Sequence, residues 1–596
     1  MINQNIEDSN NSIHLISQLW HRLHVKRKKQ LFILLVIILL SGFSEIISIG
    51  SFIPFLSVLT SSNDYQPQGF FINVLNSLSI KSNFSMLFLL TITFSLAALL
   101  TIFIRLLNIW YTESIVALIG HDFSFEAYKK TICQPYDVHL YRNSSELIKI
   151  ITIQIDKTIN VINQALRMIT SIFLLIFIFS FLVFTDWQIA IVSMLFFSLT
   201  YYFIVFLSRK KLVRNSKKIN NTRSLQIQSI QEGLGSIKDL IINNKQFEYI
   251  NYYKNIDLPL RKWVAQNRLI SNSPRYLIEG ISLIFISLIS YLLFIQRNDS
   301  REIIPILGAI ALGAQRMLPH LQQVFKSWAS IKSNSADLRS VLKTIDQSFD
   351  KELLININRP FNFSSEIEFK NVFFKYKGSK EFALNNINLK IFKGEIIGII
   401  GTTGSGKTSF IDLLMGLMDP YSGEIKIDNK SLQGNTNLKK EWYASISHVA
   451  QDIYLLDKSI AQNIAFGIKR NEIDFERLIN ASKKAQIYDF ILSLPKGFDT
   501  VIGERGINLS GGQRQRIAIA KSLYSDSSFI IFDEATSALD NKTEEMIMES
   551  INTLDNKYTV VMIAHRLSSL KNCKKIFRFK NGVLEKTMED FDINKI

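Results

Sequence analysis

Cysteine and proline are scarce in this sequence, and acidic residues are fewer than basic ones. The 596 residues include two cysteines, ten prolines, 51 Asp and Glu, and 68 Lys and Arg. Cys133 and Cys573 lie in segments that we expect to face the cytoplasm, so they provide no disulfide framework, and they show no metal-ligand spacing. The sequence therefore excludes a small secreted domain held together by disulfides.

The formal net charge of +17 allows two interpretations. A nucleic-acid binder carries such a charge, and so does a membrane protein whose cytoplasmic segments are rich in Lys and Arg. Basic residues concentrate at His21–Lys29 and between Arg209 and Arg275, in each case beside apolar runs. With a hydrophobic content of 47%, this distribution favours a membrane protein, and we expect no nucleic-acid partner.

The N-terminal region lacks the features of a cleavable signal peptide. Its first apolar run is longer than a signal core and has no small-residue cleavage site. The preceding residues, Met1–Lys29, are polar and end in basic residues, so we expect them to stay in the cytoplasm. Further apolar runs predict six spans of a cytoplasmic (inner) membrane, with both chain ends in the cytoplasm. The predicted spans are Leu31–Leu59, Met86–Leu106, Met168–Thr185, Gln188–Leu207, Tyr276–Ile295 and one within Ile303–Phe325.

Several ionisable residues fall within these spans, where each costs about 2.5–3.5 kcal/mol to insert. Glu279 and Arg316 fall in the same cytoplasmic half, so they form either a structural ion pair or part of the lining of a polar cavity. Glu45 lies further out and has no evident partner. Arg105, near the cytoplasmic edge of its span, is expected to extend toward the membrane surface.

The first outer segment leaves two interpretations open. Phe71, Val74, Leu75 and Leu78 have the spacing of one helix face. The segment Gly69–Ile80 is therefore either a short amphipathic helix in the outer interface of the membrane or an irregular loop.

A phosphate-binding pattern follows the membrane region, at Gly401-Thr-Thr-Gly-Ser-Gly-Lys-Thr408. The apolar run Ile396–Ile400 before it predicts a buried strand, and Ser409–Met418 after it predicts a helix. Glycines allow the tight turn that points backbone N–H groups at a phosphate beside a helix N-terminus. Lys407 then reaches the outer phosphates, and the Thr408 hydroxyl can ligate Mg²⁺.

Three further motifs accompany this loop. They are Leu509-Ser-Gly-Gly-Gln513, the strand-like Phe529-Ile-Ile-Phe-Asp-Glu534, and Ile563-Ala-His-Arg566, which ends the apolar strand Thr559–Ile563. This set and its order resemble the nucleotide-binding domain of ATP-binding cassette (ABC) proteins. The resemblance implies that the domain binds ATP and Mg²⁺ and hydrolyses ATP.

The resemblance also implies roles for particular residues. Glu534 matches the base that activates the attacking water, His565 the histidine that contacts the γ-phosphate, and Gln451 a residue that contacts both Mg²⁺ and water. Asp533 matches the aspartate at the magnesium ion, with Thr408 and Gln451 as the other metal positions. Tyr376, in the strand-like run Ile367–Tyr376, matches the aromatic residue that stacks on adenine. The other implied phosphate-binding positions are Gly401, Thr402, Thr403, Gly404, Ser405, Gly406, Lys407 and Ser409.

The signature Ser510, Gly511, Gly512 and Gln513 begins a predicted helix, Gln513–Leu523. In ABC proteins these residues contact the ATP of the opposite subunit, so the resemblance implies two chains for each complete site, most simply a homodimer. Ser537–Asp540 matches a loop that crosses between subunits, and Gly503–Gly506 matches a loop that senses the membrane domain. Lys521 and Ser522 replace the commoner Arg-Ala after the signature helix, which leaves the catalytic set intact.

The whole layout resembles a half-size ABC exporter. The expected fold is a membrane α-helical six-span domain followed by a cytoplasmic α/β P-loop ATPase domain. We expect residues 1–30 to be a cytoplasmic segment, 31–345 the transmembrane domain, 346–365 a linker and 366–596 the ATP-binding domain. In this family short helices at two cytoplasmic bends press on the ATPase domains, and the matching positions are Gln134–Asn143 and Ile241–Ile250.

The membrane half is similar to the lipid-linked oligosaccharide flippases of bacterial protein N-glycosylation. The similarity rests on the first span with its outer Pro-Phe, the outer segment, Pro274-Arg275 with Glu279-Gly280, and Arg316–Pro319. It implies a membrane lipid partner and an amphiphilic substrate, with a polyprenyl-linked glycan as the leading candidate. The alternative is a multispecific drug or lipid exporter, or a peptide exporter. Peptide exporters often carry an N-terminal peptidase domain, for which Met1–Lys29 is too short.

Two other classes of protein would share part of this sequence pattern. A soluble ABC ATPase of DNA repair or translation would lack the six spans. An ATP-gated channel or regulator would usually have a degenerate catalytic site, and the motifs here are complete.

Overall fold

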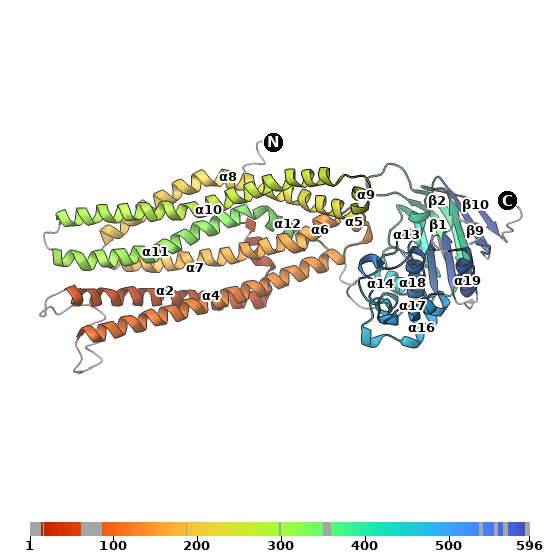
Figure 1. The fold of residues 1–596 in the computed structure, drawn as a ribbon, viewed down its shortest axis with the longest axis horizontal. Helices are drawn as coiled ribbons and strands as arrows, with labels where there is room; N and C mark the ends of the chain where they lie inside the picture. Colours follow the sequence, from red (N-terminus) through yellow and green to blue (C-terminus); the bar gives the residue numbers. More distant parts are fainter. Residues whose placement is uncertain are drawn as a thin grey trace. The chain divides into compact units, whose positions relative to one another are not determined.

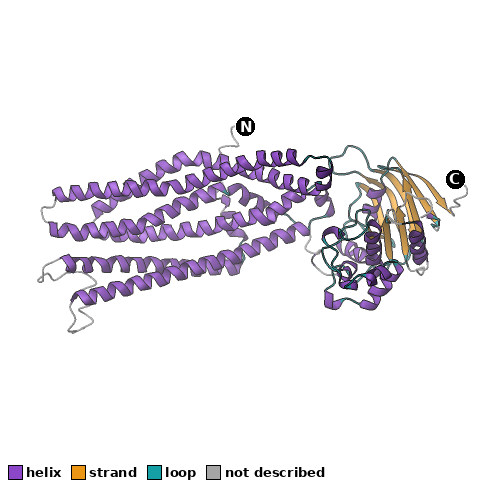
Figure 2. Cartoon of the chain, viewed as in Figure 1, coloured by secondary structure: helices purple, strands orange, loops and turns teal. Residues whose placement is uncertain are grey.

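The computed structural model describes most of the chain in two compact units. The described residues are 14–15, 17–60, 86–185, 187–296, 300–349, 354, 359–535, 540–552, 558–563, 570–571 and 573–589. The first unit contains residues 1–134 and 142–348, and the second contains residues 135–141 and 349–596. The first is helical and the second mixes helices with strands (Figure 2). The predicted segment Gly69–Ile80 lies outside the described residues.

Six long helices form the first unit and run side by side (Figure 1). Each contains one of the six predicted spans. Within the described residues, three stretches are long and apolar enough to cross a membrane: Val25–Phe52, Leu87–Ile132 and Glu146–Phe184. The long helices are α2 (Val25–Thr60), α4 (Met86–Ile132), α7 (Ile155–Thr185), α8 (Trp187–Gly235), α10 (Gln246–Gln296) and α11 (Ser300–Ser333).

The long helices have apolar outer faces and a shared apolar contact region. Leu99 and Phe103 of α4 and Leu199 of α8 are exposed, which suits helices surrounded by lipid rather than water. Ile119 of α4 and Val341 of α12 (Ser335–Ile345) are fully buried in one cluster. This cluster joins α2, α4, α7 and α12, so these helices of the first unit are packed together.

Short helices occupy both predicted cytoplasmic bends. The first bend contains α5 (Tyr136–Leu140), which groups with the second unit, and α6 (Ser144–Lys149) and the π-helix η1 (Ile150–Gln154) lead into α7. At the second bend, α9 (Ile237–Ile242) lies earlier than the predicted Ile241–Ile250. The reason is a turn at Asn244, whose left-handed φ of 53° separates α9 from α10.

The charged residues within the spans have partners that differ from the predicted ones. Glu45 of α2 is 0% exposed and forms ion pairs with Arg105 of α4 and, at 3.7 Å, with Arg316 of α11. The expectation that Glu45 lacks a partner is therefore wrong, and Arg105 turns inward instead of reaching the membrane surface. The predicted Glu279–Arg316 pair is also wrong, because Arg316 pairs with α2. Glu279 instead accepts hydrogen bonds from Arg275, one turn earlier on α10, at 2.9 Å and from Gln322 at 3.4 Å.

Two sheets form the framework of the second unit (Figure 1). An antiparallel four-stranded sheet has the order β2-β1-β4-β5, and a six-stranded sheet has the order β10-β9-β3-β8-β7-β6. In the larger sheet β9, β3, β8, β7 and β6 are parallel, which suits their nearly continuous apolar sequences. The strands are β1 (Glu366–Phe374), β2 (Leu384–Phe392), β3 (Ile396–Gly401), β4 (Ser422–Ile427), β5 (Lys430–Ser431), β6 (Ile446–Val449), β7 (Phe529–Asp533), β8 (Thr559–Ile563), β9 (Lys575–Lys580) and β10 (Val583–Glu589).

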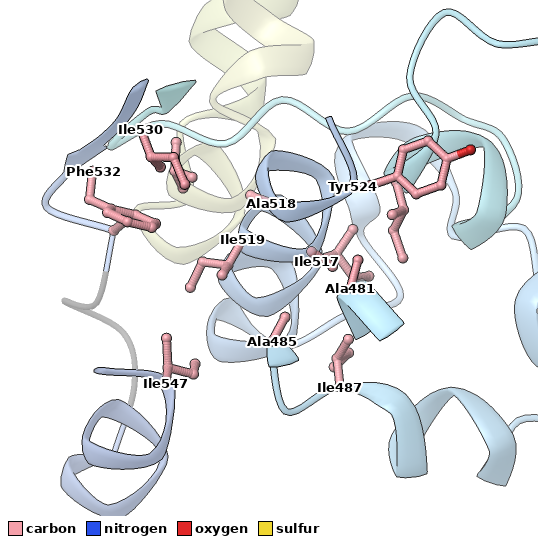
Figure 3. Packing of buried hydrophobic residues seen from close by; sticks show 14 of the residues in the cluster. Ala481, Ala485, Ile487, Ile517, Ala518, Ile519, Tyr524, Ile530, Phe532 and Ile547 are labelled. Carbon is pink, nitrogen blue, oxygen red and sulfur yellow. The ribbon is translucent and has the colours of Figure 1, made fainter. Parts of the chain in front are cut away.

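Helices cover these sheets and create two hydrophobic clusters. One lies around α13, where the rings of Phe410 and Phe369 contact each other in a tilted arrangement with centroids 4.9 Å apart. The other lies around α18, where Ile519 is fully buried together with Phe532 of β7 and the small Ala481 of α16 (Figure 3). Burying one such isoleucine contributes about 1.5–3 kcal/mol. The helices are α13 (Lys407–Leu414), α14 (Thr436–Ser445), α15 (Ile460–Ile464), α16 (Phe475–Lys484), α17 (Tyr488–Ser493), α18 (Gly511–Tyr524) and α19 (Asn541–Asn552), with 3₁₀ turns at Arg470–Glu472, Gly497–Asp499 and Glu504–Gly506.

Candidate functional site

The predicted phosphate loop connects the end of β3 to the start of α13. The Ser405 N–H donates to the Thr402 carbonyl at 3.1 Å, which closes the turn. The Lys407 ammonium folds back over the loop and donates to the carbonyls of Gly401 at 2.7 Å and Thr402 at 3.1 Å. The lysine charge is therefore held above the loop, at the N-terminus of α13, where a phosphate would lie.

Two glycines of this loop cannot be replaced without strain. Gly406 has a left-handed φ of 101°, and a Cβ there would lie 2.8 Å from the Ala383 carbonyl oxygen. A Cβ on Gly401 would lie 2.4 Å from the Phe579 carbonyl oxygen. The glycine spacing seen in the sequence thus has a steric cause, since the loop passes close to the backbone of two neighbouring segments.

The side chains of the loop leave one face open. Thr402, Thr403, Gly404 and Thr408 are exposed, while Ser409 is buried. Ser405 is 1% exposed, and its hydroxyl has no hydrogen-bond partner in the described structure. A buried hydroxyl normally has a partner, so the loop fits a phosphate oxygen that would provide one.

The predicted carboxylates lie at the same edge of the large sheet as the loop. Parallel pairing places Ile563 of β8 beside both Ile399 of β3 and Asp533 of β7, so these three strands end together. Glu534 follows directly, with a left-handed φ of 50°, and its N–H donates to the Ile563 carbonyl at 3.1 Å. A non-glycine residue in this conformation is uncommon and occurs often at functional sites.

Gln451 and Glu534 are far apart in sequence and adjacent in the structure. The Gln451 side-chain amide donates to a Glu534 carboxylate oxygen at 2.8 Å. Gln451 comes two residues after β6, and Glu534 one residue after the neighbouring β7. The structure therefore brings together two of the three predicted catalytic residues. His565 and the crossing-loop residues Ser537, Ala538 and Leu539 lie outside the described residues.

The site contains one acidic residue that the motifs do not indicate. Asp412, on α13, is buried, and its pKa is raised to about 6 by burial and by the nearby Asp533. Burial and the neighbouring Glu534 likewise raise the pKa of Asp533, against the opposing influence of Lys407. A visible signal in the sequence is that Asp412 is the lone charge in the apolar stretch Phe410–Leu414.

These groups fit a magnesium ion. Thr408, Gln451 and Asp533 offer hydroxyl, amide and carboxylate oxygens, the hard ligands that Mg²⁺ prefers. Burial and, after it, the neighbouring Glu534 raise the pKa of Asp533, which is a further argument because a divalent cation would offset both effects.

Tyr376 lies two residues beyond β1, close to the phosphate loop. Its hydroxyl forms a 2.9 Å hydrogen bond with the hydroxyl of Ser409, and its ring meets the Phe374 ring edge-on at 5.0 Å. Tyr136 of α5 has its pKa raised by burial and by the nearby Asp412 and Tyr376. The α5 helix is therefore close to the residues predicted to hold the nucleotide.

The signature segment caps a well-formed helix. Ser510 is the N-cap of α18, its hydroxyl accepts from the Gln513 N–H at 3.2 Å, and the Gln513 side chain accepts from the Ser510 N–H at 2.8 Å. Such a reciprocal capping box fixes the start of a helix. Ser510 is exposed, and Gly511, Gly512 and Gln513 are partly exposed.

Two further loops are partly described. Gly503, with a φ of 75°, precedes the 3₁₀ turn Glu504–Gly506. Asp540 accepts hydrogen bonds from the N–H and hydroxyl of Thr543, which lower the pKa of its carboxyl. Asp540 thereby caps the start of α19, as an acidic residue at a helix N-terminus does.

The glycine-rich loop, the strand-end carboxylates and the capped signature helix define a P-loop ATPase of the ABC class. A protein-family model described as ABC transporter matches residues 384–537, which include all three of these features.

The wider comparisons extend to the membrane region. The chain is 28% identical over 559 residues to the alpha-hemolysin translocation ATP-binding protein of Escherichia coli O157:H7, covering 91% of this chain and 74% of that protein. It is 39% identical over 263 residues to the leukotoxin translocation ATP-binding protein of Mannheimia glucosida, covering 44% of this chain and 36% of that protein. A bacterial Atm1-family ABC exporter with ATP bound has the same fold, with a TM-score of 0.76, 19% identity and coverage of 95% and 96% of the two chains.

The chain thus has the fold of an ABC exporter, with a helical membrane region joined to one ABC ATPase domain. Its chemistry is ATP hydrolysis coupled to transport. The predicted fold class is confirmed.

Proposed function

We propose that two copies of this chain form an ATP-driven exporter of polypeptides in the cytoplasmic membrane. The observation that carries this proposal is the match to an alpha-hemolysin translocation protein over 91% of the chain, membrane region included. The complete set of ATPase residues supports the use of ATP hydrolysis to drive transport.

The described side chains support a separate role for each group of residues in ATP hydrolysis. Lys407 and the loop N–H groups hold the phosphates, and Tyr376 holds the adenine ring. Glu534, kept in place by Gln451 at 2.8 Å, accepts a proton from the water that attacks the γ-phosphorus. The bond from that phosphorus to the bridging oxygen breaks, giving ADP and phosphate. Thr408, Gln451 and Asp533 would hold Mg²⁺, whose chemistry when bound would be to neutralise charge on the phosphates.

The need for a second copy follows from the signature segment. Each chain has one phosphate loop and one exposed capped helix start at Ser510. A helix N-terminus is an anion-binding element, so Ser510 and its glycines can complete the site of a second copy. In the first unit, α9 also exposes Ile237, Ile241 and Ile242, an apolar surface suited to contact with a partner.

The glycolipid interpretation has less support than the polypeptide interpretation. It depends on short sequence elements in the spans and on Gly69–Ile80, which lies outside the described residues. The toxin translocation proteins support the alternative interpretation of an exporter of peptides or proteins. We retain a lipid-linked oligosaccharide as the second candidate substrate because the same architecture would carry it.

The test is transport by purified protein in inside-out proteoliposomes. ATP-dependent uptake of a labelled polypeptide is measured beside flipping of a labelled polyprenyl glycolipid in the same vesicles. Uptake of the polypeptide without flipping supports the proposal. Glycolipid flipping without polypeptide uptake would replace it with the flippase interpretation. The ATPase-deficient Glu534→Gln variant controls for passive leakage.

A further inference from the structure

A polar cavity lies between the cytoplasmic parts of α7, α8, α10 and α11. Its volume is about 580 Å³, and the side chains that line it are mostly charged or carry amides or hydroxyls. All four helices belong to the first unit, so a single chain forms the cavity. A space of this size between long helices, lined mostly by residues that carry polar groups on their side chains, has room for a ligand and not only for ordered water.

The charge in this cavity is of one sign. Arg223 of α8, Arg268 of α10 and Lys326 of α11 line it, and the described lining contains no carboxylate. Lys157 also lines it, but its ammonium pairs with Asp337 at 2.7 Å, so its charge is compensated. Arg268 and Lys326 are exposed, so the cavity can be reached from water. The lining thus presents three positive charges that have no acidic partner among the lining residues.

The neutral lining groups add hydrogen-bond donors. The Asn267 amide oxygen already accepts from Asn215 at 3.0 Å, and the Gln164 amide oxygen accepts from Gln323 and Ser327, each at 3.0 Å. The side-chain NH₂ groups of both residues are further donors, and neither donates a hydrogen bond within the described part of the chain. Amide donors beside guanidinium groups suit an anion with several oxygens, and a carboxylate is such an anion.

The position of the cavity distinguishes between sources of the anion. Lys326 directly follows the range that contains its predicted span, whereas Arg268 is separated from its span by about 12 Å of helix and Arg223 by about 24 Å, all on the predicted cytoplasmic side. A lipid headgroup stays near the membrane surface, whereas a polypeptide in the cytoplasm reaches this depth freely. A headgroup could reach Lys326, but the distances of Arg268 and Arg223 from their spans favour a soluble acidic segment, which can contact all three cations.

We propose that this cavity binds an acidic, carboxylate-bearing segment of the exported polypeptide on the cytoplasmic side, before transport. The inference rests on the proposed export of polypeptides and adds the chemical class of segment that is recognised. Bidentate contacts from Arg223 and Arg268 and a point charge from Lys326 would hold the carboxylates. Because Arg268 and Lys326 are hydrated, binding should weaken as salt is raised.

The test uses the full chain in nanodiscs of zwitterionic lipid. Two peptides carry the same uncharged fluorophore, one of alternating Glu and Ser and one of alternating Gln and Ser, and fluorescence anisotropy measures their binding. The test variant combines Arg223→Gln, Arg268→Gln and Lys326→Gln. The matched control combines Lys211→Gln, Lys262→Gln and Lys343→Gln, which removes three exposed charges from α8, α10 and α12 outside the cavity lining.

The parent and the control should bind the Glu peptide at least about tenfold more tightly than the Gln peptide, and the test variant should bind both equally. An unchanged melting temperature shows that the variant is folded. If the triple change unfolds the chain, Arg268→Gln alone, at an exposed position, should reduce the preference severalfold. A parent without preference, or a variant that keeps it, overturns the proposal.

Two further measurements distinguish a peptide site from a lipid site, and the binding site from the export function. Adding anionic phosphatidylglycerol to the nanodiscs should leave the Glu preference intact, and its complete loss would assign the cavity to lipid and overturn the proposal. Transport in proteoliposomes is scored independently. A Glu preference without transport of any polypeptide would refute the export function and leave the binding site standing. Transport that is equal in parent and test variant for acidic and neutral polypeptides would refute the site alone.

Discussion

The ATPase unit and the membrane unit differ in how their polar residues find partners. In the ATPase unit, Gln451 and Glu534 meet because each follows the end of one of two adjacent parallel strands. In the membrane unit, Glu45 meets Arg105 and Arg316 because three helices pack in a particular rotation about their axes. Strand order and register fix the first kind of contact, and side-chain packing fixes the second. Motifs therefore report on one unit and not on the other.

The largest effect should come from Glu534→Gln. The substitution keeps the hydrogen-bonding shape but removes the base, so steady-state ATP turnover should fall by about 10²–10⁴-fold. Nucleotide binding should remain, because Lys407 and the loop form the phosphate cradle. Turnover is measured with purified protein and binding with a fluorescent ATP analogue. Glu545→Gln, on the exposed side of α19, is the control and should turn over at the parent rate. Parent-like turnover in Glu534→Gln would contradict the assigned base.

A mixed dimer would test whether a site needs two chains. Lys407→Ala damages the phosphate loop, and Ser510→Arg obstructs the signature helix. A dimer of one chain with each change concentrates both defects in one composite site and leaves the other intact. It should hydrolyse ATP measurably, whereas either homodimer has two damaged sites and should be nearly inactive. Differently tagged chains allow the mixed dimer to be purified. If the mixed dimer turns over ATP as slowly as the homodimers, the two composite sites do not act separately. If an isolated monomer hydrolyses ATP, the site is not shared between two chains.

The membrane comparison is tested at Glu45. Removing its charge leaves Arg105 and Arg316 without their buried partner, and breaking a buried pair costs about 3–5 kcal/mol. Glu45→Gln should therefore lower the melting temperature in detergent substantially. Glu279→Gln is the matched change, and it should have little effect because the Glu279 pair with Arg275 is exposed. Combining Glu45→Gln with Arg316→Gln should restore part of the loss. Equal effects of the two single changes would remove the distinction between buried and exposed pairs.

Much of the fold was predictable from the sequence. The apolar runs predicted all six long helices, and strands β3, β7 and β8 lie within a residue of their predicted positions. The site was predictable because its loop requires glycine for steric reasons at Gly401 and Gly406. The partners of Glu45 were not predictable, since apolar spans contain almost no polar pattern that reveals which face of a helix meets which neighbour. Asp412 was missed because it belongs to no motif, and its one signal in the sequence, a lone charge within Phe410–Leu414, does not show that it lies beside Asp533.

The smallest expected effect is a pH-dependent change in protein stability caused by Asp412. Its folded pKa is about 6, above the unfolded value of about 3.9, so between these values the folded state binds more protons than the unfolded state. Stability associated with this group is therefore fully present below about pH 4 and lost as pH rises through 6. Asp412→Asn mimics the protonated form. In EDTA the melting temperature of this variant should exceed that of the parent. The difference should grow between about pH 4 and 6 and stay constant above 7, and each kcal/mol of stability corresponds to about 2–4 °C.

The control is Asp457→Asn, at an exposed position, whose melting temperature should differ from that of the parent by the same amount across this pH range. A gain for Asp412→Asn that does not change with pH would place the cause in packing, and no gain at pH 8 would mean that the Asp412 carboxylate is already compensated. Either result would remove the case that burial and the neighbouring Asp533 disfavour the charged form of Asp412, and with it part of the argument for magnesium.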